Sequence, residues 1–244
     1  IGRVLGKYYK GAVGSLAFSI LQLRMFPPMA ILIPTVGKVR ETARRTVDSS
    51  DVRQIVQASL LYAAEHDGRL PGLSIARDGS AEGTRELATI HLVAAALARD
   101  GGLNDTSVWF SAEDRAAALA PAAAIAAPVM FDDGTLNTDF LQEKALAWDY
   151  VTGLHTSHPI TTPVAWTRGL RRDGTWDRRG VYGADGGYIA FLGGNVQFFK
   201  NLHDTPLVTP GGERTSDILK ALPAGRRIVG SGPATLGGTE SDSP

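Results

Sequence analysis

The chain has 244 residues, of which 43% are hydrophobic and 20% are charged, and its formal net charge is zero. A chain of this length buries one good hydrophobic core and has residues left for an extension, so we expect one domain with an appendage. It contains no cysteine, which excludes disulfide bonds and thiolate metal sites.

The charges are unevenly distributed along the chain. Residues 1–47 hold eight basic residues against Glu41 alone, a net charge of +7, so the remainder carries −7. A basic segment of this kind suits an anionic membrane face, or contacts with the acidic part of a neighbouring copy in a polymer. A solvated basic helix face is the alternative interpretation.

The first apolar stretch runs from Ala12 to Ile33 and is just long enough to cross a hydrocarbon core as a helix. Arg24 in its middle would cost roughly 2.5–3.5 kcal/mol in lipid, and Pro27-Pro28 would interrupt the hydrogen-bond ladder. A helix packed against copies of itself fits these residues better than a permanent membrane span, because neighbouring helices can satisfy the freed backbone groups. On this interpretation the apolar segment lies in the membrane only before the subunit assembles.

A second, amphipathic pattern follows Pro34 and ends at Asp67-Gly68, with Pro71 just beyond, which is typical of a helix end. Asp48-Ser49-Ser50-Asp51 lies within this pattern, either as a new helix cap or as a polar turn. We therefore predict an N-terminal stalk helix over residues 1–66, with an apolar part over 1–34 and an amphipathic part over 35–66. Its apolar positions recur at steps of three and four residues and include Val36, Val39, Ala43, Val47, Val52, Ile55, Val56, Leu60 and Ala63.

Residues 67–203 read as an α+β head. We expect a helix over Thr84–Arg99, a short strand at Val108–Phe110, a segment at Leu141–Val151 that favours a strand from Ala145, and a strand at Pro163–Arg168. A hairpin is predicted from Gly187–Leu192 through Gly193-Gly194 to Asn195–Lys200. Its core-facing residues, which pack with Val52, Ile55, Val56 and Leu60, are expected to be Ile189, Phe191, Val196 and Phe198. Residues 204–244 form a Gly/Pro/Ser-rich tail with two apolar islands, Ile218–Leu222 and Ile228-Val229, and we expect this tail to be ordered by packing on neighbouring copies.

Several motifs carry a resemblance to type IV pilin-like proteins and pseudopilins. Ala30-Ile31-Leu32-Ile33-Pro34 continues into Val39-Arg40-Glu41-Thr42-Ala43-Arg44-Arg45, as the apolar helix of those families continues past a proline into an Ala/Arg/Glu-rich helix. The stretch from Asp51-Val52-Arg53-Gln54-Ile55 to Tyr62 and Pro71 resembles the family's helix end. Gly186-Gly187-Tyr188 to Gly194-Asn195-Val196-Gln197-Phe198 is similar to the G-G-x-N-V-type hairpin of one pseudopilin-like branch. Where those families carry a Glu at the fifth position of the mature helix, this sequence has Leu16 or Ala17.

The resemblance implies a fold and a function. The expected fold is α+β, with a long, kinked N-terminal helix packed on a small antiparallel head. The expected function is that of a structural, non-enzymatic subunit of an extracellular or cell-surface filament, which passes through the inner membrane and periplasm. Its partners would be copies of itself, the inner membrane before assembly, and the pilus or secretion assembly machinery; no nucleic-acid binding is expected. The expected assembly interface consists of Leu16, Phe18, Ile20, Leu23, Arg24, Phe26, Ile31, Ile33 and Pro34.

Signals of catalysis or metal binding are sparse. His155 and His158 form the closest histidine pair, and no adjacent Glu gives them the spacing of a zinc protease. Asp132-Asp133-Gly134 and Asp173, Asp177 and Asp185 offer oxygen atoms for calcium, although ordinary Asp-Gly turns explain them better. We expect no cofactor. The alternative function is a membrane-anchored extracytoplasmic protein that binds a ligand or glycan through Trp109, Trp166 or Trp176.

Overall fold

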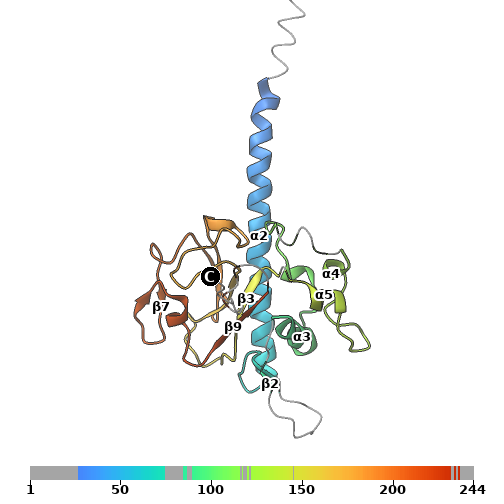
Figure 1. Cartoon of the computed structure of the whole chain (residues 1–244), viewed down its shortest axis with the longest axis vertical. Coiled ribbons are helices and arrows are strands. Elements are labelled where there is room, and N and C mark those ends of the chain that lie inside the picture. The colour runs from blue at the N-terminus through green and yellow to red at the C-terminus, as the bar shows by residue number, and fades with distance from the viewer. Residues whose placement is uncertain are drawn as a thin grey trace, which may run out of the picture. The chain divides into compact units, whose positions relative to one another are not determined.

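The computed structural model describes residues 27–74, 85–86, 90–115, 117, 120, 122–144, 146–231, 234 and 236. The chain divides into two compact units, Ile1–Arg45 and Thr46–Pro244, and the boundary lies inside helix α2, Pro27–Glu65. The second unit contains the C-terminal part of α2, a five-stranded sheet and the long connections around them (Figure 1).

Helix α2 is one uninterrupted α-helix of 39 residues, which includes both Pro34 and the polar stretch Asp48–Asp51. It ends where the sequence predicts. Asp67 and Gly68 adopt positive φ angles of 53° and 77°, and the Gly68 N–H donates to the Ala63 carbonyl at 2.8 Å. A left-handed pair after the last turn satisfies a free carbonyl and stops the helix.

The main sheet is antiparallel, with strand order β6-β5-β4-β3-β9. Its strands are β3 (Trp148–Thr152), β4 (Pro163–Thr167), β5 (Gly187–Phe191), β6 (Val196–Phe199) and β9 (Arg227–Gly230). The predicted strand at Pro163 and the predicted Gly193-Gly194 hairpin are confirmed. The second apolar island of the tail becomes β9, whose Val229 pairs with Tyr150 of β3, so the tail contributes an edge strand to the sheet.

Short elements surround this sheet. The short elements are β1 (Leu73–Ser74) paired with β2 (Arg85–Glu86), α3 (Ile90–Asp100), η1 (Ser107–Trp109), α4 (Ala122–Ala126), α5 (Thr138–Gln142), η3 (Gly183–Asp185), β7 (Leu207–Val208) paired with β8 (Arg214–Thr215), and η4 (Ile218–Ala221). Figure 1 shows α3, α4 and α5 on one side of the C-terminal part of α2 and the β7 hairpin on the other. Two predictions are corrected here. The helix expected from Thr84 begins at Ile90, and the expected strand at Val108–Phe110 is largely a 3₁₀ turn, which buries Trp109 completely.

The predicted architecture is wrong, although the chain is α+β. We expected a long, kinked stalk helix carrying a small head. The five-stranded sheet instead dominates the structure, and α2 is a single helix whose last turns belong to the core of the sheet-containing unit. The physical reason is the amount of apolar surface contributed by residues that the sequence indicated only weakly. Fully buried Trp148, Tyr150 and Trp166 of β3 and β4 need a core much larger than a small head provides.

The predicted common face of the hairpin is also corrected. Ile189 pairs with Gln197, whereas Tyr188 pairs with Phe198 and Ala190 pairs with Val196. Residues directly opposite each other share a face and successive residues alternate, so Val196 and Phe198 lie on the face opposite to Ile189. The ring of Phe198 contacts those of Tyr188 and Tyr182, with centroids 5.1 and 5.8 Å away. The hairpin therefore packs on both faces.

Candidate functional site

The predicted assembly residues fall mostly outside the described part of the chain. Ile31, Ile33 and Pro34 lie in the first part of α2, over residues 27–41, of which only the backbone is described. Within the described residues, no helix combines the length and the apolar character needed to cross a membrane. The remaining predicted interface residues lie outside the described residues: Leu16, Phe18, Ile20, Leu23, Arg24 and Phe26.

The predicted packing residues of α2 lie in or against the core. Val52, Ile55 and Val56 have no exposed surface, and Leu60 is partly buried and packs against the hydrophobic core. A polar contact joins α2 to the sheet at this level: the Tyr150 hydroxyl of β3 lies 2.9 Å from Ser59 Oγ, which donates to the Ile55 carbonyl at 2.7 Å. Ile189 and Phe191 are buried as well, whereas Val196 and Phe198 are partly buried.

A buried carboxylate anchors α2 to two distant loops. Asp48 is 1% exposed and accepts hydrogen bonds from Ser111 Oγ at 2.6 Å and from the Tyr182 hydroxyl. Burial raises the pKa of Asp48, and the two hydrogen bonds act in the opposite direction. One turn further along, burial together with the charges of Asp48 and Asp105 raises the pKa of Asp51 to about 7. Asp48–Asp51 is therefore a continuous part of helix α2, neither a turn nor a cap, and Asp48 connects the helix to Ser111 and Tyr182.

Arg168 is a second buried polar anchor, located just after β4. Its side chain is 1% exposed and forms an ion pair with Asp114. It also donates through Nε to the Leu146 carbonyl at 3.1 Å and through Nη1 to the Arg179 carbonyl at 3.0 Å. One guanidinium therefore fixes three segments relative to each other, one of which is the charged loop after β4.

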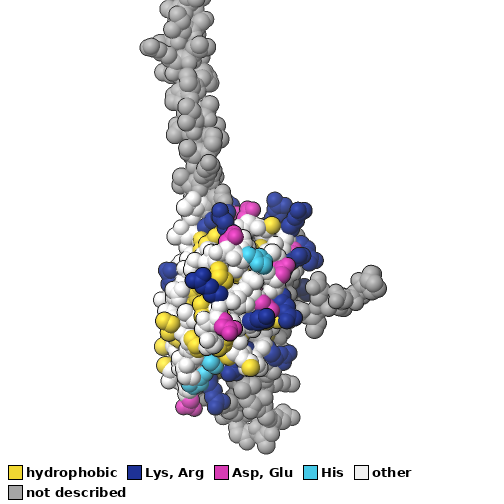
Figure 2. Space-filling model, turned by 90° about the vertical axis from the view of Figure 1, so that its left-hand side faces the viewer, with side chains coloured by type: hydrophobic (Ala, Val, Ile, Leu, Met, Phe, Trp, Pro, Cys, Tyr) yellow, Lys and Arg dark blue, Asp and Glu magenta, His cyan; other side chains and the backbone are white. Residues whose placement is uncertain are grey.

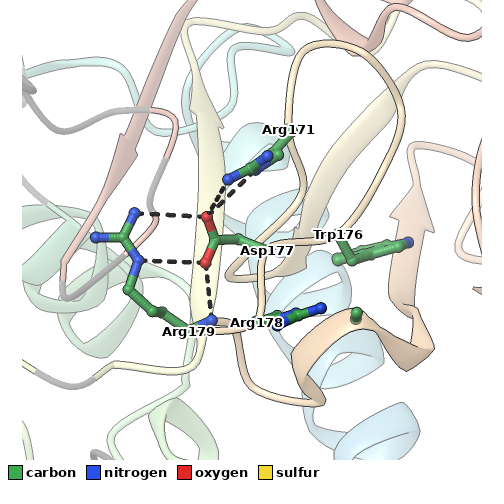
Figure 3. A pocket seen from close by; sticks show the side chains of 6 residues that line it. Arg171, Trp176, Asp177, Arg178 and Arg179 are labelled. Atoms are coloured by element: carbon green, nitrogen blue, oxygen red, sulfur yellow. Dashed lines mark hydrogen bonds and ion pairs between the residues drawn. The ribbon is translucent and has the colours of Figure 1, made fainter.

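That charged loop forms a pocket of about 430 Å³, which we call the guanidinium pocket. It is lined by Arg171, Trp176, Asp177, Arg178, Arg179 and Ala184. Figure 3 shows the Asp177 carboxylate between the guanidinium groups of Arg171 and Arg179. Trp176 and the Arg178 guanidinium lie on the side of Asp177 opposite to Arg179 (Figure 3). From the sequence, Asp173 and Asp177 are considered only as calcium ligands and Trp176 only as a stacking residue, so this pocket is not predicted.

Asp177 organises the two arginines beside it. It is 6% exposed, and it accepts from Arg171 Nη2 at 2.8 Å, from Arg179 Nε at 3.2 Å and from the Arg179 backbone N–H at 2.8 Å. These bonds, led by those from Arg179, hold the pKa of Asp177 well below its usual range. The carboxylate therefore stays ionised over the physiological pH range and keeps both guanidinium groups in place.

The three tryptophans proposed for ligand stacking have different environments. Trp109 and Trp166 are completely buried, and Trp166 Nε1 donates to Asp149 at 3.2 Å. Neither ring has a free face, so the structure excludes both from stacking on a ligand. Trp176 is 6% exposed and lines the guanidinium pocket, and its buried Nε1 has no hydrogen-bond partner among the described residues.

The histidines and acidic turns have structural roles. His155 Nε2 lies 3.0 Å from the Asp67 carbonyl, and His158 Nδ1 lies 2.9 Å from the His155 carbonyl. Asp133 and Asp173 each accept from the backbone N–H and hydroxyl of the threonine two residues later, within their own turns. Over the described ranges, no three His, Asp or Glu side chains are grouped so that they could hold a metal ion.

Comparisons with protein-family models, with curated proteins and with solved structures find no match to this chain. Two features need a function: helix α2 with the apolar sequence around its start, and the guanidinium pocket.

Proposed function

We propose that this chain is a structural subunit of an extracellular type IV pilus-like or pseudopilus-like filament that polymerises through its hydrophobic N-terminal segment. The observation that carries the proposal is the continuity of α2, which begins at Pro27 within the apolar sequence and contributes Val52 to Ala63 to a folded core. A helix of this length extends about 58 Å at 1.5 Å per residue.

The anchoring of α2 supports this function. Its C-terminal part is held by apolar contacts through Val52, Ile55 and Val56, by the Ser59–Tyr150 hydrogen bond, and by Asp48. A subunit in a filament is pulled along its helix, and these contacts resist extraction of the helix from the sheet.

The distribution of charge and apolar surface also fits self-association. The unit Ile1–Arg45 carries eight basic residues and Glu41, so its net charge is +7, and the unit Thr46–Pro244 balances it at −7. On the described face in Figure 2, hydrophobic side chains form small separate areas among charged ones. Contacts between unlike units of neighbouring copies would be electrostatically favourable and would weaken with salt. The partners would be further copies, the inner membrane before export and the assembly machinery.

Assembly of matched variants tests the proposal. Ile31→Asp places a charge in the apolar part of α2, whereas Gln57→Asp places the same charge on an exposed position of the same helix. We expect wild type and Gln57→Asp to sediment as filaments visible by negative-stain electron microscopy, and Ile31→Asp to stay in the supernatant with unchanged circular dichroism. If Ile31→Asp assembles as well as Gln57→Asp, assembly through the N-terminal helix is wrong.

A chain that never associates regularly would favour the alternative, a membrane-anchored extracytoplasmic binding protein. The guanidinium pocket is the observation that keeps this alternative in view, because it offers a candidate ligand site apart from α2. Arg24→Glu separates the two functions further. The filament function predicts weaker assembly if Arg24 meets a carboxylate or carbonyl of a neighbour, and the binding function predicts no effect on ligand affinity.

A further inference from the structure

We propose that the guanidinium pocket binds the oxyanion group of a small polar molecule, such as the carboxylate of a sugar acid or the phosphate of a sugar phosphate. This binding site is independent of filament assembly. It rests on the charge balance of the pocket, on the way its arginines are held, and on its size.

The charge balance leaves the pocket cationic. Three of its lining residues are arginines and only Asp177 is acidic. Asp173 does not line the pocket but its charge interacts with that of Arg171, whereas Asp217 pairs with Arg172 at 3.3 Å. The three guanidinium groups exceed the carboxylates of Asp177 and Asp173 by one charge, which favours binding of an additional anion.

Arg171 is preorganised for such an anion. Asp177 binds Nε and Nη2 of Arg171, which leaves the Nη1 edge of that guanidinium outside these bonds. The loop itself is fixed, because the Asp177 N–H donates to the Gly169 carbonyl at 2.7 Å and the Arg171 N–H donates to the Thr175 carbonyl at 2.8 Å. A donor that is already held in place loses less conformational entropy when it binds a ligand.

Arg178 supplies the second set of donors. It is exposed, and among the described residues it forms no hydrogen bond or ion pair, in contrast to Arg171 beside Asp177. Figure 3 shows its guanidinium on the Trp176 side of the pocket, away from Asp177. Planar guanidinium groups recognise carboxylate and phosphate oxygens through paired N–H bonds. An oxyanion that reached both Arg171 and Arg178 would therefore find donors that are not already occupied.

The size of the pocket indicates more than a bare ion. A volume of about 430 Å³ lies within the range of small-molecule sites, and it exceeds what a single phosphate needs. Trp176 adds an apolar wall with an unpartnered buried N–H. The ligand class that fits cationic donors, an aromatic wall and this volume is a monosaccharide-sized molecule that carries one anionic group.

Isothermal titration of the full chain tests the site. The probes are glucose 6-phosphate, glucuronic acid, inorganic phosphate and uncharged glucose. We expect one or both anionic sugars to bind at millimolar or lower concentration, inorganic phosphate to bind more weakly, and glucose not to bind. The anionic sugar that binds more tightly identifies the source of the oxyanion as a phosphate or a carboxylate. Binding should weaken as salt is added.

Matched variants decide whether the pocket is responsible. Arg178→Gln should weaken binding about tenfold because it removes an unpaired charged donor. Arg172→Gln is the control: Arg172 lies in the same loop and its side chain is 70% exposed, but it pairs with Asp217 and does not line the pocket. Equal effects of the two variants, or no binding of either anionic sugar, would overturn the proposal. Inorganic phosphate binding as tightly as the sugars would overturn the part of it that concerns ligand size.

Discussion

Replacing Arg168 by leucine should destabilise the folded unit more than any surface substitution. The guanidinium is fully buried, pairs with Asp114, and donates to the carbonyls of Leu146 and Arg179. Leucine keeps part of the side-chain volume but supplies no donor. The Asp114 carboxylate, 4% exposed, would lose its buried cation, and two carbonyl groups would lose the hydrogen bonds that Arg168 gives them.

The magnitude follows from the cost of breaking a buried ion pair. Removing one partner of such a pair costs about 3–5 kcal/mol, because the other charge is left uncompensated in a poor solvent. This is a large part of the roughly 5–15 kcal/mol that stabilises an ordinary domain. With a urea dependence of about 2 kcal/mol per molar, the unfolding midpoint should fall by about 1.5–2.5 M.

Equilibrium unfolding in urea, followed by tryptophan fluorescence, measures the effect. Arg172→Leu is the control, because it removes an exposed pair with Asp217 and should change the free energy of unfolding by less than about 1 kcal/mol. The double variant Arg168→Leu/Asp114→Leu should recover part of the loss, since no uncompensated charge remains. A loss below about 1 kcal/mol for Arg168→Leu, or a double variant with simply added losses, would refute the reasoning.

Three further predictions concern α2 and the sheet. Burial raises the pKa of Asp51 to about 7, above its unfolded value, so the stability it contributes is present below about pH 4 and is lost as the pH rises to about 7. Asp51→Asn should therefore flatten the pH dependence of the unfolding free energy and stabilise the protein at alkaline pH; an unchanged profile would contradict the assignment. Tyr150→Phe removes the hydrogen bond to Ser59 and should cost about 1 kcal/mol in urea unfolding, whereas wild-type stability would show that the bond contributes nothing. Gly187→Ala should lower the free energy of unfolding, measured by thermal unfolding, by about 2 kcal/mol or more, because the added methyl group would lie 2.0 Å from the Thr167 hydroxyl oxygen. The control Gly194→Ala has open space around the new methyl group and a φ of 81°, and should lower it by only about 1 kcal/mol. Equal losses for the two variants would contradict the steric argument.

Local sequence patterns predicted the elements whose signals are local. The end of α2 follows from Asp67-Gly68, and the β5–β6 hairpin follows from Gly193-Gly194 between two apolar segments. The predicted common face of Ile189, Val196 and Phe198 is wrong, because the prediction assumed that only one face of the hairpin is buried. Aromatic contacts of Phe198 with Tyr182 and Tyr188 make the other face apolar as well.

The features that sequence reasoning missed depend on partners far along the chain. Asp48 looks like a cap or turn residue within its own stretch, and it is buried because Ser111 and Tyr182, 63 and 134 residues away, hydrogen-bond to it. Strand β9 is short and has a weak local signal, and its pairing with β3 makes it a strand. A local pattern contains no information about which distant groups will satisfy a buried charge or a strand edge, so the size of the core was underestimated.

The guanidinium pocket illustrates the same limit. The run Arg171-Arg172-Asp173-Gly174-Thr175-Trp176-Asp177-Arg178-Arg179 looks like a solvated loop with mixed charge. The conformation of this loop is fixed by the hydrogen bond from Arg168 to the Arg179 carbonyl and by the ion pair between Arg171 and Asp177. Neither contact can be inferred from the spacing of the charges. The sequence signal that could have indicated the pocket is the single tryptophan, Trp176, inside this charged run.

Helical reconstruction of the native assembly by electron cryomicroscopy tests the filament proposal most directly. The account predicts ordered filaments in which residues 12–33 of neighbouring copies pack against one another and the unit Thr46–Pro244 forms the outer surface. Native material that contains only separate molecules, or a filament whose subunits touch solely through the sheet-containing unit, would contradict it.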